Sequence, residues 1–548
     1  MSSRELIVLG DTTLGGFARE LEAQARAAGL DWSVRDAGFD SWERELFEPA
    51  SATRTAEAGA LGFVLSPRIL EGVGAETMPG RLHAMLEVLK TLSPPRTVLC
   101  GNLFADPRVV LPLTSTGEGA HRAGALNDIL AEFSAKHPWF YVLDHASLAL
   151  RAGVAALNEP RYEALGALYF SPGGTRLLAT LWCRALRALT KTPAKVLVVD
   201  LDNVLWKGIV GEDGADGLQM GASGAGWFYR RFQLALRELR RSGVLLAVCS
   251  KNNPAEAQAV LCEHPDCLLR PTDFAALEIG WEPKSQGLRR LAARLGLGLD
   301  SFVFIDDSAF EREEVRSALP EVAVLEFPQD PSGLVPMLEA STAFDRLRIT
   351  KEDTLRAASY AAEAEREGLR GSAASPEEFY RSLQLTATLQ RARPADFERL
   401  HQLIHKTNQF NLTSERLSAE AFRERLGAAH FEIYGMRVAD RFGDSGLVGL
   451  ALVDRGAGTH WRVENFLLSC RVIGRTVEHA FVAWLAERAR AAGAQSLTFA
   501  FVATARNQVA REFLDRSGLT PSADGSGWGV ELADLSGLAS HYVRVMAE

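Results

Sequence analysis

The sequence predicts an α/β protein built from three domains, in which parallel sheets dominate. The chain has 548 residues, which suits about three domains of roughly 100–200 residues each. Short apolar segments rich in β-branched residues alternate with helical segments, as in parallel sheets joined by crossover helices. Hydrophobic residues make up 47% of the chain and charged residues 24%, so each domain can bury a full core.

The first domain is expected over residues 1–190. ELIVLGD (5–11), RTVLCGN (96–102) and WFYVLD (139–144) are predicted strands, and a helix from residue 17 should end at Gly29. A second helix, TRLLATLWCRALRAL, closes the domain before a boundary at KTPAK (191–195).

The second domain is expected over residues 195–340 and repeats the alternation of strands and helices. Its predicted strands are VLVVD (196–200), VLLAVCS (244–250), FVFIDD (302–307) and VAVLEF (322–327). We expect a doubly wound parallel sheet, followed by a charged helical connector over residues 341–374.

The third domain is expected over residues 375–548 as a separate α/β unit. SGLVGLALVD (445–454), WRVENFLLS (461–469) and SLTFAFV (496–502) are predicted strands. Two helices, over residues 474–493 and 506–518, should each end in glycine.

Charge and cysteine content exclude several classes of protein. The net charge of −9 argues against a general nucleic-acid binder, although a local basic pocket could still hold a phosphate. Six scattered cysteines suggest a reducing compartment. We find no signal peptide and no run of about 18 apolar residues, so we expect a cytoplasmic protein that does not bind membranes.

Polar side chains follow three predicted strands of the second domain. The carboxyl ends of such strands form the ligand crevice of a doubly wound sheet. Clustered carboxylates suit Mg²⁺, and a hydroxyl and an ammonium can hold phosphoryl oxygens. The D-x-D pair alone could equally be a set of surface turn residues, but the full series favours a phosphate site. Its members are Asp200, Asp202, Ser250, Lys284, Asp306 and Asp307.

This series resembles the haloacid dehalogenase (HAD) superfamily, with Val204 where Thr is common. The resemblance implies a nucleophile that attacks phosphorus, a general acid/base, two phosphate ligands and a Mg²⁺ site. These roles fall on Asp200 (nucleophile), Asp202 (acid/base), Ser250 and Lys284 (phosphate), and Asp200, Asp202, Asp306 and Asp307 (metal). The short interval between Asp202 and Ser250 leaves no room for a full cap domain, so an open site is expected.

Longer motifs resemble the FkbH-like proteins, which are HAD-type glyceryl transferase/phosphatases of polyketide and tetronate biosynthesis. The motifs are DLDNVLWKGIVGEDG (200–214), CSKNNP (249–254), KTNQFNLTSER (406–416), DRFGDSGLVG (440–449) and LLSCRVIGRTVEHAF (467–481). Lys207 stands where the family usually has a second Gly. The resemblance implies that 1,3-bisphosphoglycerate loses its phosphates. The glyceryl group then passes through an enzyme thioester to the phosphopantetheine thiol of an acyl carrier protein.

The third domain also resembles the GNAT acyltransferase fold. Arg471 and Gly474 fit an R-x-x-G phosphate loop before a helix, although Thr476 replaces the usual small residue. The FkbH-like resemblance implies that a polar cluster lines the acyl site, while helix capping is the alternative. The cluster comprises Lys406, Asn408, Gln409 and Asn411. Asp444 is either a turn residue or an orienting partner, and we favour the turn.

Two cysteines are candidates for the thioester. Cys249 adjoins Ser250, but alternation along a strand can turn it into the core. Cys470 precedes a helix start and lies near Arg471 and Arg475, which should lower a thiol pKa. We prefer Cys470.

The first domain resembles a degenerate SGNH hydrolase. Thr12 stands at the nucleophile position, Tyr169 at the histidine position and Gly166 at the aspartate position. Without a base the hydroxyl cannot be activated, so we expect a non-catalytic docking or scaffold domain. Two alternatives remain for the whole chain: a plain HAD phosphatase for a small phosphometabolite, and a non-catalytic docking scaffold for a carrier protein.

Overall fold

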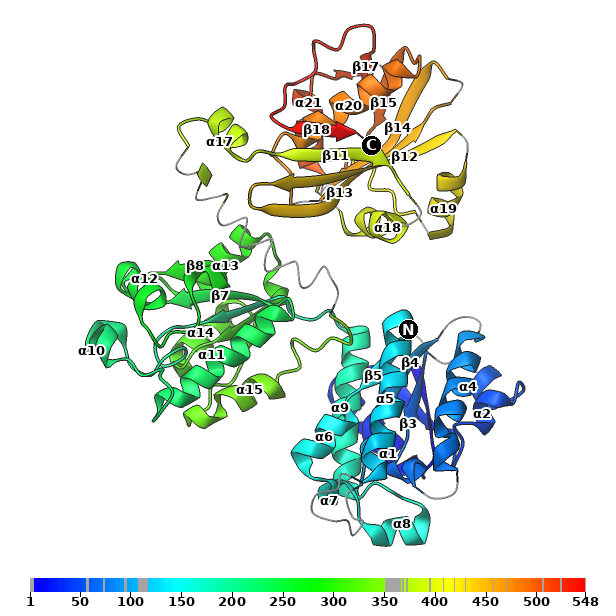
Figure 1. Cartoon of the computed structure of the whole chain (residues 1–548). Coiled ribbons are helices and arrows are strands. Elements are labelled where there is room, and N and C mark those ends of the chain that lie inside the picture. Colours follow the sequence, from blue (N-terminus) through cyan, green and yellow to red (C-terminus); the bar gives the residue numbers. More distant parts are fainter. Residues whose placement is uncertain are drawn as a thin grey trace. The chain divides into compact units, whose positions relative to one another are not determined.

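The strands form three sheets, and helices pack against them (Figure 1). The structure is a computed structural model. The chain divides into two units, Met1–Thr354 and Leu355–Glu548. The first unit contains two sheets and the second unit one. The described residues are 4–55, 59–71, 74–92, 96–106, 117–349, 366, 369–370, 373–393, 396–407, 409–417, 419–428, 430–456, 458–469, 471–504, 507–522 and 525–547.

The first sheet has the order β2-β1-β3-β4-β5, and all its pairings are parallel. Residues along β1 alternate between two cores, Leu6 and Val8 in one and Ile7 and Leu9 in the other, because helices cover both faces. Strands β2 and β3 were not among the predicted strands. The strands are β1 (Arg4–Gly10), β2 (Trp32–Asp36), β3 (Ala60–Val64), β4 (Thr97–Gly101) and β5 (Phe140–Leu143). The helices are α1 (Gly15–Ala27), α2 (Arg44–Phe47), α3 (Ala52–Thr55), α4 (Met78–Lys90), α5 (Glu118–Lys136), α6 (His145–Ala152), α7 (Val154–Leu157), α8 (Pro160–Gly166) and α9 (Pro172–Thr190).

The second sheet is also parallel throughout and has the order β10-β9-β6-β7-β8. The prediction of a doubly wound α/β domain is confirmed. Strand β8 was missed, and of the predicted strand at 322–327 only two residues pair. The strands are β6 (Val196–Val199), β7 (Leu245–Ser250), β8 (Phe274–Ile279), β9 (Phe302–Ile305) and β10 (Ala323–Val324). The helices are α10 (Val210–Gly217), α11 (Gly226–Arg241), α12 (Pro254–Glu263), α13 (Lys284–Leu295), α14 (Ala309–Ala318) and α15 (Leu334–Ala340).

The segment after α15 connects the two sheets of the first unit. Arg184 of α9 pairs with Asp345, with Nη2 2.6 Å from Oδ1, and Ala194 N donates to the carbonyl of Ala343. Residues 341–349 of the expected helical connector are not helical, and residues 350–365 lie outside the described residues.

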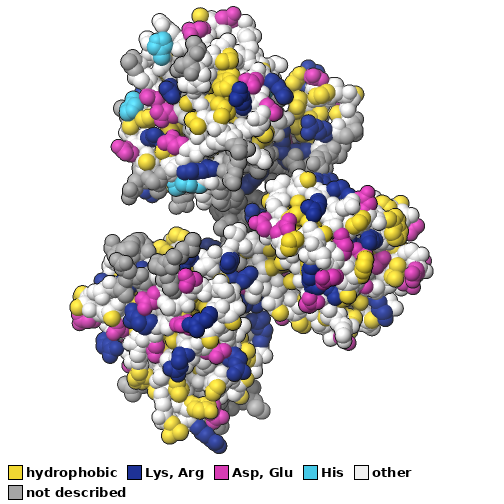
Figure 2. All heavy atoms as spheres, turned by 180° about the vertical axis from the view of Figure 1, so that it is seen from behind, with side chains coloured by type: hydrophobic (Ala, Val, Ile, Leu, Met, Phe, Trp, Pro, Cys, Tyr) yellow, Lys and Arg dark blue, Asp and Glu magenta, His cyan; other side chains and the backbone are white. Residues whose placement is uncertain are grey.

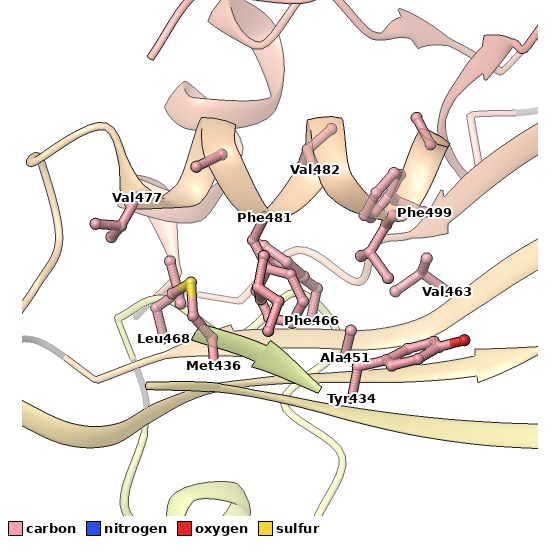
Figure 3. Packing of buried hydrophobic residues seen from close by; sticks show 14 of the residues in the cluster. Tyr434, Met436, Ala451, Val463, Phe466, Leu468, Val477, Phe481, Val482 and Phe499 are labelled. Atoms are coloured by element: carbon pink, nitrogen blue, oxygen red, sulfur yellow. The ribbon is translucent and has the colours of Figure 1, made fainter. Parts of the chain in front are cut away.

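The sheet of the second unit is mostly antiparallel, with the order β16-β17-β15-β14-β13-β12-β11-β18. Helix α20 places Val477 and Phe481 against this sheet, where they meet Phe466 and Leu468 (Figure 3). A separate apolar cluster joins α18 and α19 to the sheet. The strands are β11 (Thr386–Arg391), β12 (Phe431–Asp440), β13 (Gly443–Asp454), β14 (His460–Leu468), β15 (Ser496–Ala500), β16 (Thr520–Pro521), β17 (Gly527–Glu531) and β18 (Arg544–Ala547). The helices are α17 (Pro376–Ser382), α18 (Phe397–Lys406), α19 (Ala419–Gly427), α20 (Val477–Ala491) and α21 (Gln508–Arg516).

The visible surface carries charges of both signs. Apart from the grey atoms, Lys and Arg side chains alternate with Asp and Glu in Figure 2, and the described residues in this view show no continuous basic field. None of the described helices combines the length and apolar composition that a membrane span needs.

Candidate active site

The site lies at the carboxyl edge of the second sheet, where its central strand β6 ends. Val199 is in register with Ile305 of β9 and with Val248 of β7. Asp200 therefore follows β6 at the level where Asp306 follows β9, and its amide donates to the carbonyl of Ile305 (3.0 Å). Parallel pairing thus brings together carboxylates that are more than a hundred residues apart in the sequence.

Three carboxylates form a group that can hold a metal ion. One oxygen each of Asp200, Asp306 and Asp307 lie within 4.8 Å of one another. Asp200 and Asp306 are buried. Hard oxygen donors at this spacing fit a small divalent cation such as Mg²⁺, because one ion can reach all three oxygens and offset their mutual repulsion.

Lys284 is the cation already present in the site. It begins α13, its side chain is 2% exposed, and its Nζ lies 2.9 Å from Asp200 Oδ1 and 2.9 Å from Asp306 Oδ2. Nζ also donates to the carbonyl of Cys249 (2.8 Å). Burial acts to lower the pKa of Lys284, but the two carboxylates outweigh burial and hold that pKa above its usual value. One ammonium against three carboxylates leaves an excess of negative charge that favours a bound cation.

The pKa values of Asp306 and Asp307, the two aspartates after β9, are raised by the same surroundings. Burial and the charge of Asp200 raise the pKa of Asp306 to about 6, although Lys284 and the Ser308 amide act to lower it. The pKa of Asp307 is also raised, by burial and by Asp200. A cation in the site would favour the ionised form of both groups.

The carboxylate of Asp202, which was expected among the metal ligands, lies outside the three-carboxylate group. Its Oδ1 accepts hydrogen bonds from Trp206 Nε1 (2.9 Å) and the Val210 amide (3.2 Å). Its Oδ2 accepts one from Asn252 Nδ2 (2.9 Å). The two aspartates of D-x-D therefore have different surroundings. Asp200 belongs to the three-carboxylate group, whereas three hydrogen-bond donors hold the Asp202 carboxylate outside it.

Ser250 ends β7 beside β6, and its buried hydroxyl accepts a hydrogen bond from Asn252 Nδ2 (3.2 Å). Asn252 thus links Ser250 to Asp202, a role that sequence reasoning missed although CSKNNP was among the motifs. Arg312 was also missed. Its Nη1 donates to the carbonyls of Asp306 (2.9 Å) and Asp307 (2.8 Å) and so orders the loop after β9.

The chain between Asp202 and α11 makes only small elements. They are the isolated bridges Asp202–Trp206 and Lys207–Gln219 and the helix α10. Asn203 adopts a left-handed conformation (φ 54°) and accepts a hydrogen bond from the Gly208 amide. This flap contains no inserted domain, as the short spacing in the sequence predicted.

Cys249 does not have the surroundings of a reactive thiol. The residue is 4% exposed, and burial raises the pKa of its thiol to about 12. Its Sγ faces the Lys284 carbonyl at 3.7 Å. A thiol with this pKa is almost wholly protonated near neutral pH. The preferred candidate, Cys470, lies outside the described residues, as does Asn408.

The segment around Asn411 lies beside β14, at the point where β14 and β15 stop pairing with each other. Pairing between β14 and β15 ends at Val463 and Phe499, and the segment around Asn411 continues beyond it. The Leu412 amide donates to Phe466, and Asn507 Nδ2 donates to the Asn411 carbonyl (3.0 Å). Asn411 is fully buried, whereas Gln409 is exposed. The Asn411 side chain donates to the Thr407 carbonyl (3.4 Å) and accepts from the Ser414 amide (2.9 Å), which favours a structural role.

The R-x-x-G loop precedes α20 as expected, but its glycine amide is engaged. Gly474 (φ 77°) donates its N–H to Glu478 Oε1 (3.2 Å), and burial raises the pKa of Glu478 to about 7. A phosphate at this amide would have to displace the carboxyl group. Arg471 is half-buried. Asp444 is exposed and accepts from the Gly446 amide (2.7 Å), as a turn residue does.

In the first domain, Thr12 lies beside the segment that was aligned with the SGNH base. Its hydroxyl donates to the Ala167 carbonyl (2.6 Å) and accepts from the Tyr169 amide (3.0 Å). The Tyr169 hydroxyl donates to Asp106 Oδ2 (2.9 Å). The Thr12 proton is thus committed to a backbone carbonyl rather than a base. The SGNH assignment itself stays a prediction.

Comparisons with known proteins give a fold but no family. No family model matches the chain, and no curated protein matches it. A crystal structure of the N-terminal part of the protein BF1531 from Bacteroides fragilis, which contains a phosphatase domain and is complexed with Mg, aligns with a TM-score of 0.57 and 24% identity. The alignment covers 63% of this chain and 94% of that chain.

Two further structures align more weakly. One is described as a GNAT-family acetyltransferase from Desulfovibrio desulfuricans (TM-score 0.23, 16% identity, 27% of this chain and 99% of that chain). The other is Ard1 from Thermoplasma volcanium (TM-score 0.21, 16% identity, 26% of this chain and 95% of that chain). The TM-scores of these two alignments are too low to support an argument about this chain.

The chain is an α/β protein, and its fold is similar to that of the Bacteroides structure. The 63% share of this chain that aligns with the Bacteroides structure is larger than the second unit, so the alignment includes at least part of the first unit. That unit carries the three-carboxylate group at a sheet edge.

Proposed function

We propose that the second sheet carries a Mg²⁺-dependent phosphatase of the HAD type. The observation that carries this proposal is the convergence of Asp200, Asp306 and Asp307 within 4.8 Å, with Lys284 bridging the first two. The Mg complex of the Bacteroides phosphatase-domain structure supports the choice of metal.

The residues suit a two-step displacement. The Asp200 carboxylate attacks phosphorus, which forms an aspartyl phosphate and breaks the bond to the leaving oxygen, and Asp202 gives that oxygen a proton. Asp202 then takes a proton from a water molecule, whose oxygen attacks the same phosphorus and releases inorganic phosphate from Asp200. Ser250 and Lys284 hold the phosphoryl oxygens throughout. When bound, Mg²⁺ would neutralise charge on the phosphoryl group.

The finer proposal is glyceryl transfer from 1,3-bisphosphoglycerate to an acyl carrier protein in polyketide or tetronate biosynthesis. The Cys470 thiolate would attack the acyl carbon and release the C1 phosphate, and the carrier's phosphopantetheine thiol would then displace Cys470. The site at Asp200 would hydrolyse the C3 phosphate ester. The FkbH-like motifs support this reading.

A large partner is also supported by the surface at the carboxyl edge of the second sheet. Trp227 in the first turn of α11, Trp281 after β8 and Phe310 in the first turn of α14 are exposed by 46%, 73% and 74%. Each belongs to a segment at this edge. Exposed aromatic side chains are typical of surfaces that bind another protein.

Intact-mass spectrometry of a carrier protein tests the finer proposal. The phosphopantetheinylated carrier is incubated with enzyme, Mg²⁺ and 1,3-bisphosphoglycerate. We expect a glyceryl adduct with the wild type, none with Cys470→Ala, and an undiminished adduct with Cys249→Ala. Normal loading by Cys470→Ala would contradict the role of that cysteine.

Two observations favour a plain phosphatase as the second candidate. The Gly474 amide already binds Glu478, and the segment at Asn411 fills the gap between β14 and β15. The Gly474 amide belongs to the R-x-x-G loop that was expected to bind a phosphate, and Asn411 belongs to the polar cluster that was expected to line the acyl site. Phosphate release without a carrier adduct would select this candidate.

A further inference from the structure

Helix α18 carries two histidines one turn apart, on the same face of the helix. The Nε2 atoms of His401 and His405 lie 3.2 Å from each other. Each also lies 3.0 Å from the carbonyl oxygen of Leu417. Two imidazole nitrogens and one carbonyl oxygen therefore form a triangle with sides of 3.0, 3.0 and 3.2 Å.

Protons alone do not satisfy this triangle. If both nitrogens carry hydrogen, the two lone pairs of the Leu417 oxygen accept both N–H groups, but the two donors then face each other across the 3.2 Å contact between the nitrogens. If one nitrogen is bare, its lone pair faces the lone pairs of the Leu417 carbonyl at 3.0 Å. In either case one of the three short contacts is unfavourable. A cation at the centre would accept a lone pair from every corner.

We propose that His401, His405 and the Leu417 carbonyl bind a divalent transition-metal ion of the Zn²⁺, Ni²⁺, Co²⁺ or Cu²⁺ class. Tetrahedral zinc with Zn–N bonds of about 2.0–2.1 Å sets its ligands about 3.3 Å apart, close to the observed triangle. Imidazole ligands favour these borderline metals over Mg²⁺. Three protein donors leave a fourth position for water.

The surroundings hold the ligands in place. The His401 ring stacks on Phe397 (centroids 5.8 Å apart, planes at 5°) and leans on Phe422. The Leu417 side chain is buried in the cluster that joins α18 to the sheet, which limits movement of its carbonyl. His405 is exposed, so an ion can enter from solvent.

The ion would clamp α18 to the chain just before α19. The segment between His405 and Leu417 includes Asn411, which pairs with Leu467 of β14. Binding at the two ends of this segment would restrict it and stabilise the second unit. The site is separate from the three-carboxylate group and does not rest on the proposed phosphatase function.

Equilibrium dialysis of the untagged full-length chain against Zn²⁺, followed by metal analysis, tests the site. Excess Mg²⁺ occupies oxygen-donor sites and limits binding elsewhere. His405→Gln removes a ligand at an exposed helical position that glutamine tolerates. His430→Gln, at an exposed position of the same unit, is the matched control. We expect His405→Gln and His401→Gln each to bind one equivalent less than the wild type, and His430→Gln to bind the same amount.

Co²⁺ gives a second readout. We expect the intense visible spectrum of a four-coordinate nitrogen-ligated site in the wild type and in His430→Gln, and its loss in His405→Gln. Thermal unfolding without metal shows whether the variants are folded. Equal Zn²⁺ stoichiometry in the wild type and in folded His405→Gln would overturn the proposal, as would an unchanged Co²⁺ spectrum.

Discussion

Removal of the Lys284 ammonium tests the electrostatics of the site. In Lys284→Met the carboxylates of Asp200 and Asp306 lose a cation 2.9 Å away, in surroundings where the lysine is 2% exposed. Breaking a buried ion pair by removing one partner costs about 3–5 kcal/mol. Asp306, whose pKa is about 6, can avoid part of this cost by binding a proton. We therefore expect Lys284→Met to lose about 3 kcal/mol of the free energy of unfolding near pH 7.

Proton uptake and metal binding should both change this penalty. Without Lys284 the pKa of Asp306 rises further, so the destabilisation is smaller at pH 5, where Asp306 is protonated, than at pH 8. Mg²⁺ should stabilise Lys284→Met more than the wild type, because it supplies the positive charge that was removed.

Hydrogen exchange of peptides that cover β6 and β9, measured across a urea series, gives the local free energy of unfolding. This readout is preferable to a global transition because a chain with several domains need not unfold in one step. Lys251→Met is the control. Lys251 pairs with Glu311 at 2.6 Å but is 32% exposed, and such pairs contribute about 0–1 kcal/mol. Equal stability of Lys284→Met and Lys251→Met at pH 8 would refute the reasoning.

Three further outcomes are expected. Asp200→Asn should lower Mg²⁺-dependent phosphate release by about a thousandfold or more, as measured with a phosphate assay, and retention of most activity would exclude Asp200 as the nucleophile. Glu478 has its pKa raised from 4.5 to about 7, so between these values the unfolded chain has lost a proton that the folded chain retains. Stability should then fall by up to about 1.4 kcal/mol per pH unit in this window and level off above pH 7. Glu478→Gln should abolish this fall in denaturation curves, and an unchanged pH profile would contradict the assignment. Cys249, with a thiol pKa of about 12, should alkylate at pH 8 at least about a hundredfold more slowly than the exposed Cys262 in peptide mass spectrometry, and equal rates would show that the thiol is accessible.

The carboxylate group could be predicted from the sequence because parallel strands end at a common edge. Asp200 and Asp306 each follow a short apolar strand, and the register between β6 and β9 converts that pattern into proximity. The direction of the Asp202 carboxylate could not be predicted. It depends on Trp206 and Asn252, which reach it from the flap and from the neighbouring loop.

Other features depend on packing that a linear pattern does not contain. Strand β8 carries Phe274 in the core, but Glu278 interrupts its apolar residues and its last three residues are only half-buried. The strand predicted over residues 322–327 lies at the edge of the sheet and pairs with β9 only at Ala323 and Val324. The hydrogen bond from the Gly474 amide to Glu478 depends on a side chain in the first turn of α20. The R-x-x-G motif does not predict this hydrogen bond.

Trapping an aspartyl phosphate tests most directly whether Asp200 attacks phosphorus in a Mg²⁺-dependent reaction. The protein is mixed with an acyl phosphate and Mg²⁺ and reduced with borohydride, which converts an aspartyl phosphate to homoserine, and the modified residue is located by peptide mass spectrometry. We expect homoserine at position 200, and none when Mg²⁺ is chelated or in Asp306→Asn. Modification at another residue, or at position 200 without dependence on Mg²⁺, would contradict this expectation.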